Sequence, residues 1–335
     1  MSEFVKSQNY ICVSGYGWTG SSACIDILKE FKGFGALKGE FRIAKDPYGL
    51  SDLENSLVHN WDFMRNDVAI RDFLNYCEVL GRGTGLFKKT GKDLSRKLNI
   101  DFMAESRLYI DRLTDMTYSG DTLIHRYNIS AYDNFCMKIK SKFGKNNGKF
   151  MYFSRPDSLN FIKETKLYID NLFDSYMKIN KINKVILDQT VPPTNIYNTS
   201  KYFENIKTII IDRDPRDIYA NMVRGKRLLG PELINHDSVE KYIIWHKQLR
   251  RISIKDVENS SKNTLRLYFE DLIFKYDETI EKIIAFLGDG AQHNCKGKNF
   301  LPELSINNTG LWKGYKDQSI MKKIALELED YCYNV

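Results

Sequence analysis

The alternation of apolar and polar positions divides the chain into short strand-like runs and longer helical stretches. Five runs rich in valine, isoleucine and aromatic residues have turn residues or helical periodicity on either side, which predicts short buried strands. These runs are Tyr10–Ser14, Phe34–Gly39, Lys184–Asp188, Lys207–Asp212 and Thr264–Phe269. Because buried strands that alternate with helices favour a mainly parallel sheet covered on both faces, the predicted fold class is α/β, a three-layer fold of the P-loop type.

A long helical insertion separates the second predicted strand from the third. Helical spacing of apolar residues predicts helices at Leu53–Phe63, Val68–Leu80, Ile129–Phe143 and Ser158–Ile179. We therefore expect one α/β domain over residues 1–335 with a helical insertion at about 48–181, which would supply a lid or an acceptor pocket. Its aromatic residues, among them Tyr109, Tyr118, Tyr127 and Tyr132, could line such a pocket or belong to a core.

Composition narrows the class of protein without naming a ligand. With 335 residues and 42% hydrophobic content, the chain can bury a substantial core. The 50 Lys and Arg residues against 43 Asp and Glu residues favour anionic ligands, but these charges are dispersed and do not call for nucleic acid. The six cysteines show no Cys-x-x-Cys pattern, so no metal site is expected. No apolar leader or membrane span of about 18 residues is apparent, which predicts a cytoplasmic protein.

The segment YICVSGYGWTGSSACIDILKEFK, residues 10–32, carries the clearest chemical signal. An apolar run ends at Ser14, a glycine-rich turn follows, and an amphipathic stretch begins at about Ser21. Gly15, Gly17 and Gly20 allow the backbone to turn sharply and to approach an anion closely. Because the free N–H groups at the start of a helix attract negative charge, this strand, loop and helix predict a phosphate site.

The glycine loop by itself leaves the kind of phosphate compound open. Gly15 and Gly20 have the Walker spacing, but Ser21 stands where that motif needs a lysine, so hydrolysis of a nucleoside triphosphate is not expected. Gly15, Gly17 and Gly20 also fit Gly-x-Gly-x-x-Gly, and Glu40 follows the second strand where a ribose-binding acid belongs. The loop alone is therefore compatible with an oxidoreductase that uses a nicotinamide or flavin cofactor.

A second candidate anion site follows the fourth strand, in the segment IIIDRDPRDIYAN. Arg213 comes directly after the strand, Pro215 suits a first helical turn, and Asn221 lies further along the predicted helix. An arginine in this place can bind a phosphate through two parallel N–H bonds. The alternative is an ion pair between Arg213 and Asp217 at the start of the helix.

These segments together resemble the sulfotransferases that use 3′-phosphoadenosine 5′-phosphosulfate. The similar segments are SGYGWTGSSA (residues 14–23), RDPRDIYAN (213–221), LRLYFEDLI (265–273) and GLWK (310–313). The resemblance covers the sheet and both ends of the cofactor but not the insertion. It favours a sulfotransferase over an oxidoreductase or a non-catalytic nucleotide-binding protein, because a dehydrogenase needs no Arg-Asp-Pro-Arg-Asp segment after a strand.

The resemblance implies a set of cofactor-binding residues at two ends of one site. In the family the glycine loop grips the 5′-phosphosulfate, and the later arginine segment grips the 3′-phosphate. Carried onto this chain, the set is Gly17, Trp18, Thr19, Gly20, Ser21 and Ser22 in the loop, with Arg213, Asn221, Phe269 and Lys313 elsewhere. The hydroxyl groups of the loop could instead serve as helix caps.

Several positions depart from the family pattern. Trp18 stands where the family often has Lys or Arg, so it would stack on a base or anchor the loop in apolar surroundings. Asn221 replaces a serine, and Phe269 replaces a tyrosine near the adenine. The usual Arg-Lys-Gly before Gly-x-Trp-Lys is absent, so Lys313, or Lys296 or Lys298, would supply the missing charge.

An acceptor hydroxyl group needs a general base, and two carboxylates follow predicted strands. Glu40 is the first candidate: it is expected to adjoin the phosphate loop and resembles the glutamate of several carbohydrate sulfotransferases, although it could instead pair with Arg42 or Lys38. Asp188 is the second candidate, with Gln189 in the place of a family lysine. The resemblance implies in-line sulfuryl transfer without a metal, to a saccharide or another small-molecule acceptor.

Overall fold

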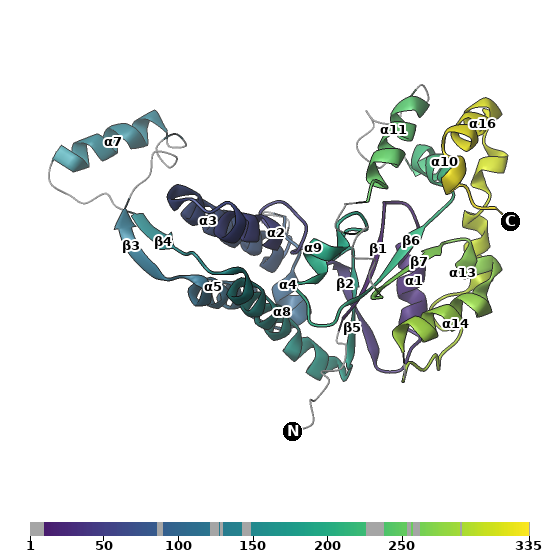
Figure 1. Cartoon of the computed structure of the whole chain (residues 1–335), viewed down its shortest axis with the longest axis horizontal. Helices are drawn as coiled ribbons and strands as arrows, with labels where there is room; N and C mark the ends of the chain where they lie inside the picture. The colour runs from purple at the N-terminus through teal and green to yellow at the C-terminus, as the bar shows by residue number, and fades with distance from the viewer. Residues whose placement is uncertain are drawn as a thin grey trace. The chain divides into compact units, whose positions relative to one another are not determined.

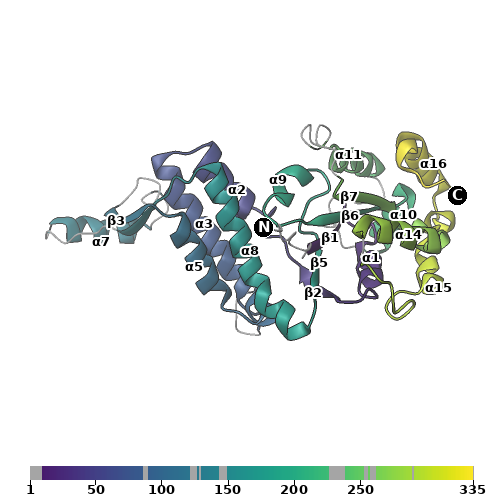
Figure 2. The same cartoon turned by 60° about the horizontal axis from the view of Figure 1, so that its bottom comes forward.

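The computed structural model describes residues 10–85, 90–120, 127, 130–142, 149–225, 238–252, 256, 262–288 and 290–334. The chain divides into two compact units (Figures 1 and 2). The first unit comprises residues 1–45 and 177–335, and the second comprises residues 46–176. No helix in the described ranges is long and apolar enough to cross a membrane.

A five-stranded parallel sheet forms the centre of the first unit (Figure 1). Its order is β2-β5-β1-β6-β7, and the strands are β1 (Tyr10–Gly15), β2 (Phe34–Glu40), β5 (Lys184–Asp188), β6 (Lys207–Asp212) and β7 (Thr264–Tyr268). Every residue of β1 is buried, as expected for a central strand with both faces covered. The five predicted strands are confirmed, and each observed end lies within one residue of the predicted end.

Helices cover both faces of this sheet, which confirms the α/β fold class. Apolar residues of α1 (Ser21–Leu28), α13 (Asp271–Phe274) and α14 (Tyr276–Leu287) pack with Val13, Ile186 and Ile209 in one core. On the opposite face, Tyr10 makes an edge-to-face contact with Phe203, which follows α9 (Ile196–Ser200). Apolar side chains on both faces of the strands are therefore buried.

A second apolar cluster lies beyond the end of β6. It joins α10 (Pro215–Gly225), α11 (Val239–Leu249) and α16 (Gln318–Glu327), with Tyr219 and Tyr242 in edge-to-face contact. The chain between α14 and α16 contains only short helices in its described residues: α15 (Pro302–Ser305) and two 3-10 turns, Ile306–Asn308 and Leu311–Gly314. A third such turn, Glu329–Tyr331, follows α16.

The second unit is mainly helical. Its helices are α2 (Leu50–Glu54), a π-helix (Asn55–His59), α3 (Phe63–Gly81), α4 (Leu94–Leu98), α5 (Phe102–Leu113), α7 (Ala131–Lys142) and α8 (Ser158–Asn180). In its core, Tyr109 stacks on Tyr168, so this aromatic residue belongs to the core, whereas Tyr127 and Tyr132 are exposed.

One prediction for the insertion was wrong, and one pair of strands was not predicted. A single helix over Leu53–Phe63 does not form, because the side chain of Asp62 accepts a hydrogen bond from Met64 N and thereby starts α3 at Phe63. The antiparallel pair of β3 (Met116–Gly120) and β4 (Lys149–Phe153) was not predicted. The predicted helix Ile129–Phe143 is confirmed for Ala131–Lys142, while its two ends lie outside the described residues.

The strand order tests the dinucleotide-binding hypothesis that the glycine loop left open. In the dinucleotide-binding fold the first strand pairs with the second, which places the ribose-binding acid beside the glycine loop. Here β1 pairs with β5 and β6, and β5 separates β2 from β1. Glu40 therefore does not adjoin the glycine loop as expected, and the dinucleotide arrangement is absent from this sheet. Ligands of parallel α/β sheets bind outside the carboxyl ends of the strands at the point where the strand order reverses. Here this point lies at β1, because its neighbours β5 and β6 lead to opposite edges of the sheet.

Candidate functional site

The glycine loop forms a tight turn between β1 and α1. Gly17, Trp18 and Gly20 all have positive φ angles, of 86°, 59° and 84°. Gly20 is the N-cap residue of α1 and brings no side chain to the first turn, so the alternative role of the loop hydroxyl groups as the N-cap is not observed. The N–H groups of this first turn have the direction and partial charge that suit an anion.

Replacing Gly20 by alanine is expected to destabilise the protein by about 2 kcal/mol or more. A left-handed backbone at φ +84° strains an alanine, and its Cβ would lie 2.4 Å from the Phe269 ring. Denaturant unfolding of G20A should show this loss. The matched control is Gly314→Ala, where a Cβ has no atom within 4 Å and φ is not positive. Equal stability of G20A and the control would contradict the tight packing of the loop.

Arg213 lies between the glycine loop and the C-terminal part of the chain. Its side chain is only 3% exposed. Nη1 donates to the carbonyl oxygen of Trp18 at 3.1 Å, and Nη2 donates to that of Asn308. The contacts of the guanidinium group are thus with neutral carbonyls and not with the Asp217 carboxylate that the alternative hypothesis named. Nε has no hydrogen-bond partner among the described residues.

A buried cation of this kind is costly unless it gains an anionic partner. Burial lowers the pKa of Arg213, and the negative charges of Asp217, Glu270 and Asp214 oppose this shift. Since its Nε lacks a partner among the described residues and its Nη1 contacts the glycine loop, the guanidinium is suited to binding an anion such as phosphate. The electrostatics of Arg213 therefore favour an anionic ligand.

One pocket joins the glycine loop and Arg213. It has a volume of about 440 Å³ and lies within the first unit. Of the residues that the sequence predicted to bind a cofactor, it brings together Trp18, Gly20, Ser22, Arg213, Asn221 and Phe269. The parallel sheet gathers the ends of β1, β6 and β7 at one edge, so the segments that follow these strands meet around one cavity.

The remaining predicted cofactor residues do not line this pocket. Thr19 is buried beneath the loop, and a Cβ on Gly15 would meet its hydroxyl oxygen at 2.0 Å. Gly17 and Ser21 shape the turn and begin α1. Lys313 lies in the Leu311–Gly314 turn, with Nζ 5.8 Å from the centre of the Trp312 ring.

Trp18 takes the anchoring role, one of the two roles that the sequence left open. Its ring packs against the apolar cluster of α10, α11 and α16, and a Cβ on Gly225 would lie 2.7 Å from it. It also lines the pocket, and its Nε1 has no hydrogen-bond partner in the described part of the chain. The ring therefore anchors the loop, and stacking on a base stays a prediction.

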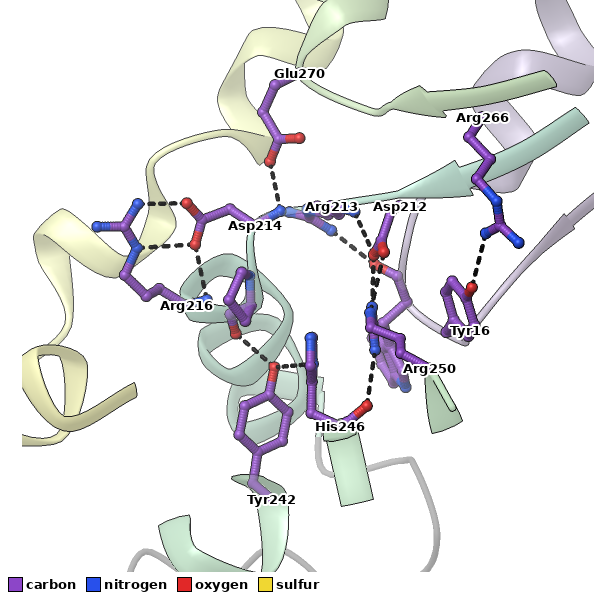
Figure 3. Close-up of polar contacts among 12 residues, drawn as sticks. Tyr16, Asp212, Arg213, Asp214, Arg216, Tyr242, His246, Arg250, Arg266 and Glu270 are labelled. Atoms are coloured by element: carbon purple, nitrogen blue, oxygen red, sulfur yellow. Dashed lines mark hydrogen bonds and ion pairs between the residues drawn. The ribbon is translucent and has the colours of Figure 1, made fainter. Parts of the chain in front are cut away.

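Ion pairs fix the backbone on either side of Arg213 (Figure 3). Asp212 accepts hydrogen bonds from Nε and Nη2 of Arg250, at 3.0 and 2.5 Å. Asp214 accepts from Arg216, whose guanidinium also lies 4.2 Å from the Trp312 ring centre. Arg216 is thus occupied in structural contacts, and Arg213 is held between two paired carboxylates.

The two candidate general bases lie side by side at the carboxyl ends of β2 and β5. The Cα atoms of Glu40 and Asp188 are partners in the parallel register. Phe41 N donates to Asp188 O at 3.1 Å, and the Thr190 hydroxyl donates to Phe41 O at 2.6 Å. These bonds hold the two strand ends together. Glu40 also pairs with Arg42 at 3.4 Å, which was its alternative role, yet its side chain remains 42% exposed.

Asp188 has the electrostatic character of a functional carboxylate. Burial, followed by the negative charge of Glu40, raises its pKa from 3.8 to about 6. Its Oδ1 is buried without a hydrogen-bond partner among the described residues. Because its strand β5 pairs directly with β1, Asp188 lies one strand closer to the glycine loop than Glu40 does. A carboxylate with such a pKa suits proton transfer near neutral pH.

Asn308 and Gln189 are among the contributors to the site that were missed from the sequence. Asn308 acts through its backbone carbonyl, which no side-chain pattern reveals. Gln189, noted only as a departure from the family pattern, has its amide within hydrogen-bonding distance of the Gly15 backbone and the Ser21 hydroxyl. Its position directly after the predicted strand Lys184–Asp188 was the available signal. No group of three His, Cys, Asp or Glu side chains in the described ranges could hold a metal ion.

Glu270 is a buried carboxylate beside this site, and it should make stability depend on pH. Burial raises its pKa from 4.5 to about 7, so the folded protein holds the proton more tightly than the unfolded chain. Its contribution to stability is complete below pH 4.5 and is lost as the pH rises through about 7. Glu270→Gln should therefore raise the free energy of unfolding at pH 8 by up to about 3 kcal/mol while changing it little at pH 4.5.

Denaturant unfolding of wild type and E270Q between pH 4.5 and 8 measures this difference. In the wild type, Glu270 Oε1 accepts a hydrogen bond from Asp214 N at 3.0 Å, and the glutamine of E270Q keeps a side-chain oxygen that can accept the same bond. The control is Glu240→Gln, an exposed residue paired with Lys323. A difference between E270Q and wild type that does not vary with pH would contradict the raised pKa of Glu270.

Comparisons with known proteins add similarities at low identity. No family model matches the chain. A 121-residue stretch is 29% identical to one component of the aspartyl/glutamyl-tRNA(Asn/Gln) amidotransferase of Mycoplasmopsis agalactiae. This match covers 35% of the chain and 26% of that protein, so the chain spans about a quarter of the length of this curated relative.

Solved structures that are similar to the chain include the sulfotransferase domain of the Synechococcus PCC 7002 olefin synthase, with 12% identity over 100% of this chain and 98% of that chain and a TM-score of 0.41. The sulfotransferase domain from the curacin biosynthetic pathway has 12% identity over 97% of this chain and 98% of that chain, with a TM-score of 0.41. Retinol dehydratase with androsterone and the inactive cofactor PAP has 14% identity over 96% of this chain and 80% of that chain, with a TM-score of 0.36. At these values, the function of the present chain rests on its own site.

Proposed function

We propose that this protein is a sulfotransferase that moves a sulfuryl group from 3′-phosphoadenosine 5′-phosphosulfate to an acceptor hydroxyl group. The observation that carries the proposal is Arg213, a buried cation that contacts the glycine loop through the Trp18 carbonyl and lines one pocket together with that loop, and whose Nε has no hydrogen-bond partner among the described residues. A ligand with two phosphate groups suits a cavity that is lined by both the first turn of α1 and a buried arginine. The four sequence segments that resemble sulfotransferases border this same part of the fold.

The roles of the residues follow from their positions. The N–H groups at the start of α1, with the Ser22 hydroxyl, would hold the 5′-phosphate and the sulfuryl oxygens. Arg213 and Asn221 would hold the 3′-phosphate, and Phe269 would contact the adenine. Gly17, Thr19 and Ser21 would hold the loop in its shape around the bound donor, and Lys313 would supply positive charge near it. Sulfuryl transfer then depends on positioning and on stabilising the leaving phosphate group.

For the general base we propose the acidic pair of Asp188 and Glu40, with Asp188 accepting the proton. Its raised pKa and its buried oxygen, which has no hydrogen-bond partner among the described residues, support this choice over Glu40, which the sequence placed first. The neighbouring Glu40 charge contributes to the raised pKa of Asp188. A saccharide acceptor is proposed only from the resemblance to carbohydrate sulfotransferases.

Calorimetric titration with adenosine 3′,5′-bisphosphate, NAD and ATP tests the proposal. We expect tight binding of the bisphosphate and weak binding of the other two compounds. A preference for NAD would instead support an oxidoreductase. Incubation with the sulfuryl donor and a panel of saccharides and small hydroxyl compounds, followed by mass spectrometry, tests transfer. Bisphosphate binding without transfer to any acceptor would support a non-catalytic nucleotide-binding protein.

A further inference from the structure

One side of the proposed nucleotide pocket consists of a segment with little regular structure of its own. Residues 293–312, which we call the strap, contain only α15 and short 3-10 turns, and all of them are described. Asn299, Phe300 and Leu301 in the strap line the pocket, and Leu304, Ser305 and Asn308 line it further along. Because such a segment lacks a continuous backbone hydrogen-bond ladder, its position depends on bonds to other elements.

A single carboxylate makes several of these bonds. Glu30, two residues after α1 ends, has a fully buried side chain. Its Oε1 accepts hydrogen bonds from Asn299 N at 2.7 Å and from Phe300 N at 3.0 Å. Its Oε2 lies 2.8 Å from His293 Nε2 and accepts from Gly297 N at 3.3 Å. All four groups belong to the strap.

The backbone of Glu30 contributes in the same way. Its carbonyl oxygen accepts hydrogen bonds from Asn294 N and Cys295 N, each at 3.2 Å. The ring of Phe31, the next residue, lies 4.9 Å from the His293 ring. One end of the strap is thus bound at six points to a single residue of the chain that carries the phosphate loop.

The other end of the strap is attached next to Arg213. Asp217 accepts hydrogen bonds from Gly310 N at 2.7 Å and from Trp312 N at 3.0 Å. Between these two attachments, the carbonyl oxygen of Asn308 accepts the bond from Arg213. The strap therefore connects the Glu30 carboxylate to the proposed 3′-phosphate site.

The Glu30 carboxylate is ionised in this arrangement. Burial by itself would raise its pKa, but the hydrogen bonds from Asn299, Phe300, His293 and Gly297 outweigh burial and lower the pKa. Removing the charge would leave strongly oriented backbone N–H groups with a weaker acceptor or none. An unsatisfied buried donor of this kind is costly, so the strap would move to regain partners.

We propose that Glu30 is a positioning residue for the nucleotide pocket: it fixes residues 293–300 and thereby places the strap against the bound nucleotide. The inference rests on the proposed function, since the probe is adenosine 3′,5′-bisphosphate. Glu30 itself does not line the pocket, so its effect on the ligand is transmitted through Asn299, Phe300 and Leu301.

The test uses Glu30→Gln and Glu30→Ala in the full chain, with calorimetry and hydrogen exchange of backbone amides. For E30Q we expect about a tenfold weaker bisphosphate affinity, and for E30A a larger loss, because a charged acceptor is replaced by a neutral one or by none. Exchange of the Gly297, Asn299 and Phe300 amides should rise at least about tenfold in both ligand-free variants, with α1 and the sheet unchanged.

The matched control is Glu54→Gln in the second unit. Glu54 is also a buried carboxylate paired with a histidine, His59, at 3.2 Å. Its replacement should lower stability without changing bisphosphate affinity or strap exchange. Wild-type affinity in E30Q, or faster exchange spread over the whole first unit, would overturn the role of Glu30. Failure of the wild-type protein to bind bisphosphate would overturn the proposed function, and this inference with it.

Discussion

Replacing Arg213 by alanine is expected to weaken the binding of adenosine 3′,5′-bisphosphate by about a hundredfold or more, because charge-assisted bonds from a buried guanidinium to a phosphate are among the strongest polar contacts. The side chain is 3% exposed and its Nε has no partner in the described part of the chain. A bound phosphate would give the Arg213 guanidinium an anionic hydrogen-bond partner and so offset the free-energy cost of burying its charge.

Calorimetry of R213A, R213K and Arg216→Ala measures this effect. Lysine keeps the charge but cannot form two parallel bonds, so R213K should fall between wild type and R213A. Arg216 is the matched control: it comes from the same segment, pairs with Asp214 and does not line the pocket. Unfolding curves should accompany the titrations, because Arg213 also binds the Trp18 and Asn308 carbonyls. Equal affinities of folded R213A and R216A would refute the assignment of the 3′-phosphate site.

Replacing Asp188 by asparagine is expected to lower turnover by about a hundredfold or more while leaving bisphosphate affinity nearly unchanged. Asp188 would act as a base only when ionised, and its pKa is raised to about 6. Wild-type turnover should therefore rise with pH up to about 6 and then level off. The rate that remains in D188N should lack this acidic limb.

Glu40→Gln provides the companion variant. Because the negative charge of Glu40 helps to raise the pKa of Asp188, its removal should move the acidic limb of the pH profile to lower pH, with a smaller loss of turnover than in D188N. Turnover of each variant across pH 4.5 to 8 with saturating donor would show this. If E40Q loses turnover and D188N retains it, the general base is Glu40, as the sequence first indicated.

Much of the fold could be predicted because its signals are local. Buried strands such as Lys184–Asp188 show as continuous apolar runs, and the glycine loop requires residues that tolerate positive φ. The structure of the insertion was harder to predict from the sequence. The side-chain cap at Asp62 divided one expected helix, and the β3–β4 pair depends on partners that lie far apart in the sequence.

The candidate site could be predicted only in part. Trp18, Gly20 and Arg213 belong to recognisable sequence motifs, and the structure brings them together around one pocket. The order of Glu40 and Asp188 relative to the loop could not be read from the chain, because strand pairing is set by packing of the whole sheet. Asn308 contributes a backbone carbonyl and Glu30 a bond to a distant segment, and neither leaves a pattern in the sequence.

The sequence by itself determined the α/β class and the positions of the glycine loop and of the arginine segment, which it predicts to be anion sites. These features follow from local periodicity and from the conformational limits of glycine and proline, which act over a few residues. Only the tertiary structure decided that β5 lies between β1 and β2, that Arg213 faces the loop, and that the strap is attached to Glu30. Such contacts join segments up to 270 residues apart, and they form only because folding buries their polar groups together.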